Sequence, residues 1–344
     1  MLEESSTALV EAHDLVMFDL DGVVYVGGRA VPGAAQAIAR LRAAGVHPAF
    51  VTNNASRTPE EVGDRLRGLG VEAADGDVVT SAQAAAHLVR ETWGGVRVLA
   101  LGGRGLTAAL AAEGLTVVPA DVDVVQAGDV DVVASGFGPD VRWRHIMRAA
   151  ALVADGVPYV ASNADWTLPT ESGLQPGHGV LVDTIARYAG VVPVVAGKPA
   201  RHLLDETVRR VGGERPLMVG DRLDTDIEGA RAAGAPSLLV LTGVTWLPEL
   251  VVAGPEQRPT YLSVDLDGLF TPHPVPVSEG GTTRCGGWAV GVAGDRLVVT
   301  GDGDPDDWWR AVAVAAWDLL DRTGEPADTD GLHPPVARSA GARR

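Results

Sequence analysis

The stretch Val16-Met17-Phe18-Asp19-Leu20-Asp21-Gly22-Val23-Val24-Tyr25 decides the fold predicted for this chain. Its apolar first half predicts a buried parallel strand, and Gly22 allows a sharp turn after that strand. Asp19 and Asp21 stand where the strand ends, and open α/β sheets bind ligands at the carboxyl ends of their strands. The two carboxylates therefore predict a catalytic pocket at this edge. The motif Asp19-Leu20-Asp21-Gly22 occurs a second time as Asp265-Leu266-Asp267-Gly268. The sequence that follows each copy must therefore decide which of them is functional.

Composition narrows the classes of partner. The 344 residues carry 28 Lys and Arg against 45 Asp and Glu, a formal net charge of −17, which argues against a nucleic-acid partner. No apolar run approaches the ~18 residues of a membrane span, and the acidic N-terminus lacks the basic region of a signal peptide. The single cysteine, Cys285, allows no internal disulfide. We expect a cytoplasmic protein with no membrane insertion.

Strand and helix patterns alternate along the chain as in a Rossmann-like α/β core. Apolar runs at 47–51, 191–196, 216–220 and 237–241 predict further parallel strands, with 261–264 as an edge strand. Polar clusters follow three of these runs: Thr52-Asn53-Asn54-Ala55-Ser56-Arg57, Gly197-Lys198-Pro199 and Asp221–Asp226. Thr58 and Thr80 each begin a capping box that predicts a helix start.

The spacing of these clusters predicts an inserted domain. Positions 53 to 197 place 145 residues between Thr52 and Lys198, whereas a crossover between neighbouring parallel strands needs a few tens. Residues 80–179 show their own alternation of strands and helices. We therefore predict a parallel-sheet core from 1–79 and 180–274, with an α/β cap formed by 80–179.

A Pro-rich junction precedes a small C-terminal α+β module at 275–344. Strands are predicted at 288–292 and 296–300, a helix at 308–320, and a disordered tail from Gly324. Arg284-Cys285-Gly286-Gly287-Trp288-Ala289 matches the acyl-CoA loop R-x-x-G-x-A of acetyltransferases, but it enters a strand pattern instead of a helix. An acetyltransferase-like appendage without activity is possible, and its expected role is packing or the formation of a homodimer.

The polar clusters supply the groups that phosphoryl transfer through an aspartyl phosphate requires. A carboxylate, Asp19, can attack phosphorus, while Asp21 acts as general acid and then general base. Mg²⁺, a hard ion that prefers oxygen ligands, is predicted to bind Asp19, Asp21 and Asp221. The remaining groups stabilise the transferred phosphate: Lys198 neutralises charge, Thr52 holds oxygens, and Asp226 orients Lys198 or the water ligands of the metal.

These motifs resemble those of the haloacid dehalogenase superfamily of phosphatases, subclass IIA, over residues 14–265. The resembling segments are Asp19-Leu20-Asp21-Gly22, Thr52-Asn53-Asn54, Gly197-Lys198-Pro199, Gly220–Ile227, Ser162–Thr170 and Pro176–Gly179. Their order excludes the second Asp-Leu-Asp-Gly copy, which has no motif after it. The resemblance implies a core with an inserted cap of the C2 type. The presence of Asp21 favours a phosphomonoester hydrolase, because family members that cleave carbon–halogen bonds lack a second acid there.

Substrate contacts are predicted from both core and cap. The candidates are Thr52, Asn53, Asn54, Arg57, Asn163, Asp165, His178 and Lys198. In the alternative interpretation Asn163 and Asp165 only build a turn, and Arg57 pairs with Glu60 or Glu61. A further similarity, to actinobacterial glycerol-3-phosphate phosphatases, implies sn-glycerol 3-phosphate as the small phosphomonoester.

Other functions stay open at this point. The substrate could be another phosphomonoester, such as 2-phosphoglycolate, pyridoxal phosphate or a nucleoside monophosphate. Gly103-Arg104-Gly105-Leu106-Thr107-Ala108 follows a predicted strand, with Asp121 and Asp123 about 20 residues on, which is the pattern of a dinucleotide site. A binding protein without catalytic activity is the remaining alternative.

Overall fold

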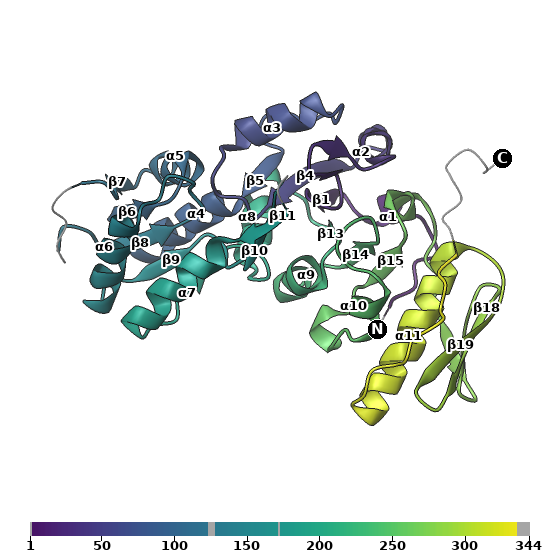
Figure 1. Ribbon diagram of the computed structural model, residues 1–344. Coiled ribbons are helices and arrows are strands. Elements are labelled where there is room, and N and C mark those ends of the chain that lie inside the picture. Colours follow the sequence, from purple (N-terminus) through teal and green to yellow (C-terminus); the bar gives the residue numbers. More distant parts are fainter. Residues whose placement is uncertain (1, 123–127, 171–172, 336–344) are drawn as a thin grey trace. The chain divides into compact units, whose positions relative to one another are not determined.

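The computed structural model describes residues 2–122, 128–170 and 173–335. The chain divides into two compact units, formed by residues 1–26, 30–47 and 213–344 and by residues 27–29 and 48–212 (Figure 1). Among the helices of the described residues, none combines the length and hydropathy needed to cross a bilayer.

The first unit contains four parallel strands in the order β15-β14-β13-β1, with the bounds Tyr261–Ser263, Ser237–Val240, Pro216–Gly220 and Leu15–Asp19. Met17 pairs with Met218, and Leu239 pairs with Leu262. The first four residues of β1 are fully buried, as expected for a parallel strand covered on both faces. β13 has the predicted bounds, and β15 confirms the predicted edge strand. The helices of this unit before residue 275 are α1 (Leu9–Ala12), α2 (Ala34–Ala43), η1 (Leu223–Ile227), α9 (Glu228–Ala233), α10 (Leu247–Val251), η2 (Pro255–Gln257) and η3 (Leu266–Phe270).

The second unit contains a parallel pair and a separate parallel sheet. β4 (His47–Thr52) pairs with β5 (Val78–Thr80), and five strands follow the order β12-β9-β8-β6-β7. These five are Val194–Val195, Tyr159–Ala161, Val132–Ser135, Arg97–Leu101 and Thr116–Pro119. The helices are α3 (Pro59–Gly68), α4 (Ser81–Trp93), α5 (Arg104–Ala112), α6 (Trp143–Ala154), α7 (His178–Ala189) and α8 (His202–Val211). Both predicted capping boxes are present, Thr58 with Glu61 and Thr80 with Gln83.

The run at 191–196 lies in a different sheet from the one predicted. β12 pairs with β9, with Val194 opposite Val160, at the edge of the five-stranded cap sheet. α7, which precedes it, packs against α6, and its Val182 and Ile185 share a buried cluster with Val133 of the cap sheet. The strand at 194–195 thus belongs to the sheet that we predicted for the cap and not to the core sheet. A short apolar run reads the same in either sheet, because periodicity does not identify a strand's neighbours.

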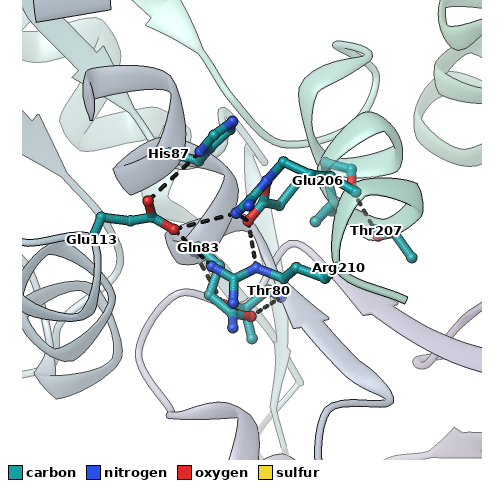
Figure 2. A network of polar contacts seen from close by, with 9 residues as sticks. Thr80, Gln83, His87, Glu113, Glu206, Thr207 and Arg210 are labelled. Carbon is teal, nitrogen blue, oxygen red and sulfur yellow. Dashed lines mark hydrogen bonds and ion pairs between the residues drawn. The ribbon is translucent and has the colours of Figure 1, made fainter. Parts of the chain in front are cut away.

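A polar network connects three helices of the second unit (Figure 2). Glu206 of α8 has a side chain only 1% exposed, and its carboxylate pairs with Arg209 and Arg210. Glu113, which follows α5, pairs with the same two arginines and lies 3.6 Å from Nδ1 of His87 on α4. Buried carboxylates are stable when their oxygens are paired in this way. The network fixes α8, the helix that follows the Lys198 loop.

The C-terminal module, residues 275–335, packs one long helix on an antiparallel sheet. The strands are β16 (Val277–Glu279), β17 (Thr282–Cys285), β18 (Trp288–Ala293) and β19 (Arg296–Gly301), and α11 (Pro305–Thr323) lies against them (Figure 1). Part of the tail that we expected to be disordered is ordered. The N–H of Asp328 donates to Asp295, and the carbonyl oxygen of Asp328 accepts from Leu297. Residues 336–344 of that predicted tail lie outside the described residues.

A buried polar network attaches α11 to the segment after β15. The Arg310 guanidinium donates to the carbonyl oxygen of Leu262 at 3.1 Å and to Asp307 at 2.9 Å, and lies 3.1 Å from Nδ1 of His273. Nε2 of His273 lies 2.8 Å from the carbonyl oxygen of Gly268. Since a guanidinium only donates and a carbonyl only accepts, His273 is neutral with its proton on Nε2. Burial, and then the charge of Arg310, lower the pKa of His273 to about 4.

We expect this histidine to make the folded protein less stable in mild acid. Its pKa rises from about 4 to 6.5 on unfolding, so its stabilising effect is complete above pH 6.5 and is lost as the pH falls toward 4. The whole difference amounts to about 3 kcal/mol. His273→Gln, which does not titrate, should lower the free energy of unfolding at neutral pH and decline less steeply in acid, as measured by urea denaturation. An equally steep decline in the variant would contradict the assignment.

Candidate active site

Three carboxylates of the first unit form a group that could hold a metal ion. Asp19 ends β1, Asp221 follows β13, and Asp226 lies on η1, the π-helical turn after it. One carboxylate oxygen from each lies within 4.8 Å of the others. The donor set consists of oxygens alone, which suits a hard cation such as Mg²⁺. Asp221 and Asp226 are fully buried, where like charges this close favour the binding of a cation.

Two loop segments approach the Asp221 carboxylate so closely that they carry glycine, at Gly22 and Gly243, where they face it. Its Oδ2 accepts a hydrogen bond from the N–H of Val244 at 2.6 Å. A Cβ added to Gly22 or to Gly243 would lie less than 3.0 Å from the carboxylate. Gly22 also has a φ of 91°, in the left-handed region that favours glycine. The two glycines therefore allow the backbone to approach Asp221 closely from two loops.

Asp226 is held by the turn that carries Asp221. Its Oδ2 accepts from the N–H groups of Asp221 and Arg222, both at 3.1 Å. A Cβ on Gly220 would collide with the Asp226 side chain, so glycine is required at the end of β13. The π-helical turn brings the fifth residue after Asp221 back onto the backbone of Asp221.

The group of carboxylates and the predicted metal set share two residues. Asp19 and Asp221 belong to the group of carboxylates, but Asp226 is the third member in place of Asp21. Asp21 lies on the turn after β1 and is exposed, with its neighbour Gly22 bonded through its N–H to Tyr25. Asp226, which we predicted to orient Lys198 or the water ligands of the metal, enters this group because the π-helical turn brings it back to the backbone of Asp221.

In the second unit, Asn53 joins the end of β4 to the Lys198 loop. Its Oδ1 accepts from the N–H of Lys198 at 2.9 Å, and its Nδ2 donates to the carbonyl oxygen of Lys198 at 3.0 Å. Nδ2 also lies 3.0 Å from Oδ1 of Asp165. Lys198 is 2% exposed, and the Lys198–Pro199 peptide bond is cis. Gly197 allows this pairing, since a Cβ there would lie less than 3.0 Å from the Asn53 amide. The Asn53 side chain is thus committed to positioning the Lys198 backbone.

The loop after Asn53 is built by local hydrogen bonds. Oγ1 of Thr52 accepts from the N–H of Asn54, and Oδ1 of Asn54 accepts from the N–H and hydroxyl of Ser56. Arg57 is exposed. Glu61, one of its two suggested partners, instead pairs with Arg104 and caps α3.

Asn163 and Asp165 form a turn that also contacts Asn53. Nδ2 of Asn163 donates to the carbonyl oxygen of Asn53 at 2.7 Å, and Oδ1 of Asn163 accepts from the N–H of Asp165. Ser81, which no sequence motif marks as a site residue, donates its hydroxyl to the same Asn53 carbonyl at 2.6 Å. Asn163 is 3% exposed, and its geometry is that of the alternative interpretation, in which it builds a turn.

His178 lies inside the cap. Its Nε2 is 3.0 Å from the hydroxyl oxygen of Ser135, which is 2.8 Å from the hydroxyl oxygen of Tyr159. Burial lowers the pKa of His178 to about 4, so the ring is neutral at pH 7. The same burial raises the pKa of Tyr159. Neither Ser135 nor Tyr159 was predicted, because a hydroxyl at a strand end carries no sequence signal of its own.

The glycines of the dinucleotide pattern serve packing. Gly105 donates its N–H to the carbonyl oxygen of Ser56, and a Cβ on it would lie less than 3.0 Å from the carbonyl oxygens of Ala55 and Arg57. Protein backbone therefore covers the start of α5, where a dinucleotide phosphate would bind. Asp121 is exposed, and Asp123 lies outside the described residues.

Known proteins resemble the chain along most of its length. Residues 16–116 match the haloacid dehalogenase-like hydrolase family, 195–269 match a HAD-hydrolase-like family, and 285–337 match a GCN5-related N-acetyltransferase-like domain. D-glycerol 3-phosphate phosphatase of Mycobacterium tuberculosis is 41% identical over 329 residues, which cover 90% of this chain and 88% of the relative. A glycerol phosphate phosphatase of that organism, crystallised with magnesium, has a TM-score of 0.80 at 41% identity, covering 91% of this chain and 92% of the other. Acid sugar phosphatase of Staphylococcus haemolyticus is 34% identical over 253 residues, 73% of this chain and 93% of the relative.

The Asn53 contacts predict a difference between two adjacent asparagines. Asn53→Ala removes bonds to the backbone of buried Lys198 and should lower the free energy of unfolding by about 1–3 kcal/mol. Asn54→Ala, the matched control, removes the bonds of Asn54 to Ser56 within its own turn and should lower the free energy of unfolding by less. Urea denaturation of the two variants measures the difference. If both variants lost the same free energy of unfolding, the bonds between Asn53 and Lys198 would stabilise the protein no more than the turn bonds of Asn54 do.

Proposed function

Because this chain belongs to the haloacid dehalogenase-like hydrolases and is a phosphatase, we propose that it hydrolyses sn-glycerol 3-phosphate through an aspartyl phosphate on Asp19. The family predicted from the sequence motifs is confirmed by the relatives and the family matches. The observation that carries the proposal is the group of carboxylates Asp19, Asp221 and Asp226 at the ends of neighbouring strands. A related phosphatase was crystallised with magnesium, which supports Mg²⁺ as the ion that this group would hold.

The carboxylate of Asp19 is the proposed nucleophile. Its oxygen forms a bond to phosphorus while the bond from phosphorus to the ester oxygen breaks, and Asp21 gives a proton to the departing glycerol oxygen. Asp21 then takes a proton from water, whose oxygen attacks phosphorus as the Asp19–phosphorus bond breaks. The exposure of Asp21 is compatible with access to both leaving group and water. Bound Mg²⁺ supplies the positive charge that offsets repulsion between the nucleophile and the phosphate.

Lys198 and Thr52 are proposed to stabilise the transferred phosphate. The ammonium group of Lys198 neutralises charge that develops on its oxygens, and the hydroxyl of Thr52 holds one of them. Both residues are buried, and the Asn53 amide fixes the backbone of Lys198. Preorganised groups of this kind need not reorient during the reaction.

The substrate is proposed from the relatives and from the polar loops around Asn53. The M. tuberculosis relative bears the name D-glycerol 3-phosphate phosphatase, and the two chains align over 90% of this one. Asn54, Arg57 and Asp165 are proposed to contact the substrate. Asn53 and Asn163 act through the loops that they hold, and His178 acts through Ser135. Another small phosphomonoester is the alternative. A homodimer and a cytoplasmic location stay predictions from the sequence.

Phosphate release from a panel of esters tests the substrate. The panel contains glycerol 3-phosphate, 2-phosphoglycolate, pyridoxal phosphate, nucleoside monophosphates, sugar phosphates and p-nitrophenyl phosphate, each with Mg²⁺ and with chelator. We expect kcat/KM for glycerol 3-phosphate to stand well above the others and to require Mg²⁺. Similar kcat/KM values for all the natural esters, with p-nitrophenyl phosphate the highest, would contradict this substrate. The assignment as a phosphomonoester hydrolase would still hold.

Two substitutions separate the proposed roles of the first motif. Asp19→Asn removes the nucleophile and should reduce phosphate release to the rate without enzyme. Asp21→Asn removes the general acid and should reduce kcat by roughly 10²–10⁴-fold. With p-nitrophenyl phosphate, whose leaving group needs little protonation, the loss in Asp21→Asn should be smaller. Near-normal turnover by Asp19→Asn would exclude the covalent mechanism.

A further inference from the structure

We propose that the C-terminal module maintains the metal site by bracing the loop 242–246, which holds Asp221, through a contact between Trp309 and Trp246. This inference rests on the proposed Mg²⁺-dependent phosphatase. It gives a positioning role to a module that matches an N-acetyltransferase-like family but takes no part in the proposed reaction.

The loop 242–246 holds the metal-site turns through two backbone N–H groups and one hydroxyl. Val244 donates its N–H to Oδ2 of Asp221 at 2.6 Å, and Thr245 donates its N–H to the Asp221 carbonyl oxygen at 3.1 Å. Oγ1 of Thr242 donates to the carbonyl oxygen of Gly22 at 2.6 Å. The loop therefore binds both the Asp221 turn and the turn after Asp19. A shift of this loop would move the carboxylate that it holds.

The last residue of the loop packs on the C-terminal helix. The rings of Trp246 and Trp309 lie edge to face, with centroids 4.9 Å apart and planes at 66°. Trp309 is 1% exposed and also makes an edge contact with Trp308, whereas Trp246 is 49% exposed. Such pairs contribute beyond the area that they bury. Trp309 is the rigid partner in this pair, and Trp246 is fixed by resting on it.

The same apolar cluster supports the third carboxylate. Leu223 and Ile227, which flank Asp226 on η1, share one buried cluster with Leu241 and with Trp308 and Trp309 of α11. The module thus forms the interior behind both the 242–246 loop and the η1 turn. Outer groups that orient metal ligands commonly change metal affinity by ~10–100-fold when removed.

The segment of the module that resembles an acyl-CoA loop, Arg284–Ala289, has a structural role that is compatible with this proposal. Gly286 and Gly287 form the turn between β17 and β18, so a strand and not a helix follows them directly. A Cβ on Gly286 would lie less than 3.0 Å from the Asp307 side chain, so α11 closes over the turn. The segment that resembles an acyl-CoA loop is a hairpin packed on the same helix that carries Trp309.

Titration of Mg²⁺ into the full-length protein by calorimetry tests the proposal without reference to turnover. Trp246→Ala removes a half-exposed ring and should leave the core folded, while weakening Mg²⁺ binding by ~10-fold. Trp309→Ala should weaken it equally, and the double variant should be no weaker than either single one, because all three break one contact. Trp309→Phe, which keeps an aromatic edge, should retain most of the affinity. The melting temperature with chelator verifies folding in each case.

Leu297→Ala is the control, since Leu297 is 2% exposed in β19 and shares the buried cluster of Trp309 without belonging to the loop or to the tryptophan contact. It should lower the melting temperature and leave the Mg²⁺ dissociation constant within about twofold. Unchanged affinity in both tryptophan variants would overturn the proposal. Equal weakening by Leu297→Ala, or additive weakening in the double variant, would also overturn it, because a general loss of stability would then suffice. Failure of the wild-type protein to bind Mg²⁺ would instead reject the proposed function itself.

Discussion

The close approach of three carboxylates is the constraint on which this structure depends. Like charges with oxygens within 4.8 Å repel each other, so the arrangement favours hydrogen-bond donors and a group that could hold a cation. Backbone N–H groups provide the donors, from Val244 to Asp221 and from Asp221 itself to Asp226. Backbone can come this near only where a Cβ is missing, as at Gly22, Gly220 and Gly243. The glycines, the π-helical turn and the loop braced by the C-terminal module all follow from the need to hold charged groups together.

Local chemistry predicted much of the fold. β13 has its predicted bounds because an apolar run ends at a glycine and a carboxylate, and α3 begins where Thr58 and Glu61 form a capping box. The run at 191–196 was placed in the wrong sheet, because its partner strand, β9, is a property of tertiary pairing. The tail after Gly324 reads as disordered by composition, yet Asp328 pairs with the edge of β19. Contacts between distant segments override composition at such positions.

The same holds for the candidate site: residue types predict some of its members, and the others depend on the geometry of the fold. Asp19 and Asp221 could be predicted as candidate site residues because open α/β sheets bind ligands at the carboxyl ends of their strands. That Asp226 lies in the group of carboxylates could not be foreseen, because a π-helical turn changes which residue returns to the strand end. Asn53 was predicted as a substrate contact, but its amide pairs with the backbone of Lys198. Val244 and Gly243 were missed, since an N–H donor and an absent Cβ leave no motif.

Chemical trapping of the intermediate tests the central claim most directly. Borohydride reduces an acyl phosphate to an alcohol, so quenching the enzyme during turnover of glycerol 3-phosphate should convert the phosphorylated aspartate to homoserine. Peptide mass spectrometry then identifies the position. We predict homoserine at position 19, dependent on substrate and Mg²⁺ and absent at position 21. Continued turnover with no modification at position 19, or with modification at another carboxylate, would contradict the covalent mechanism assigned to Asp19.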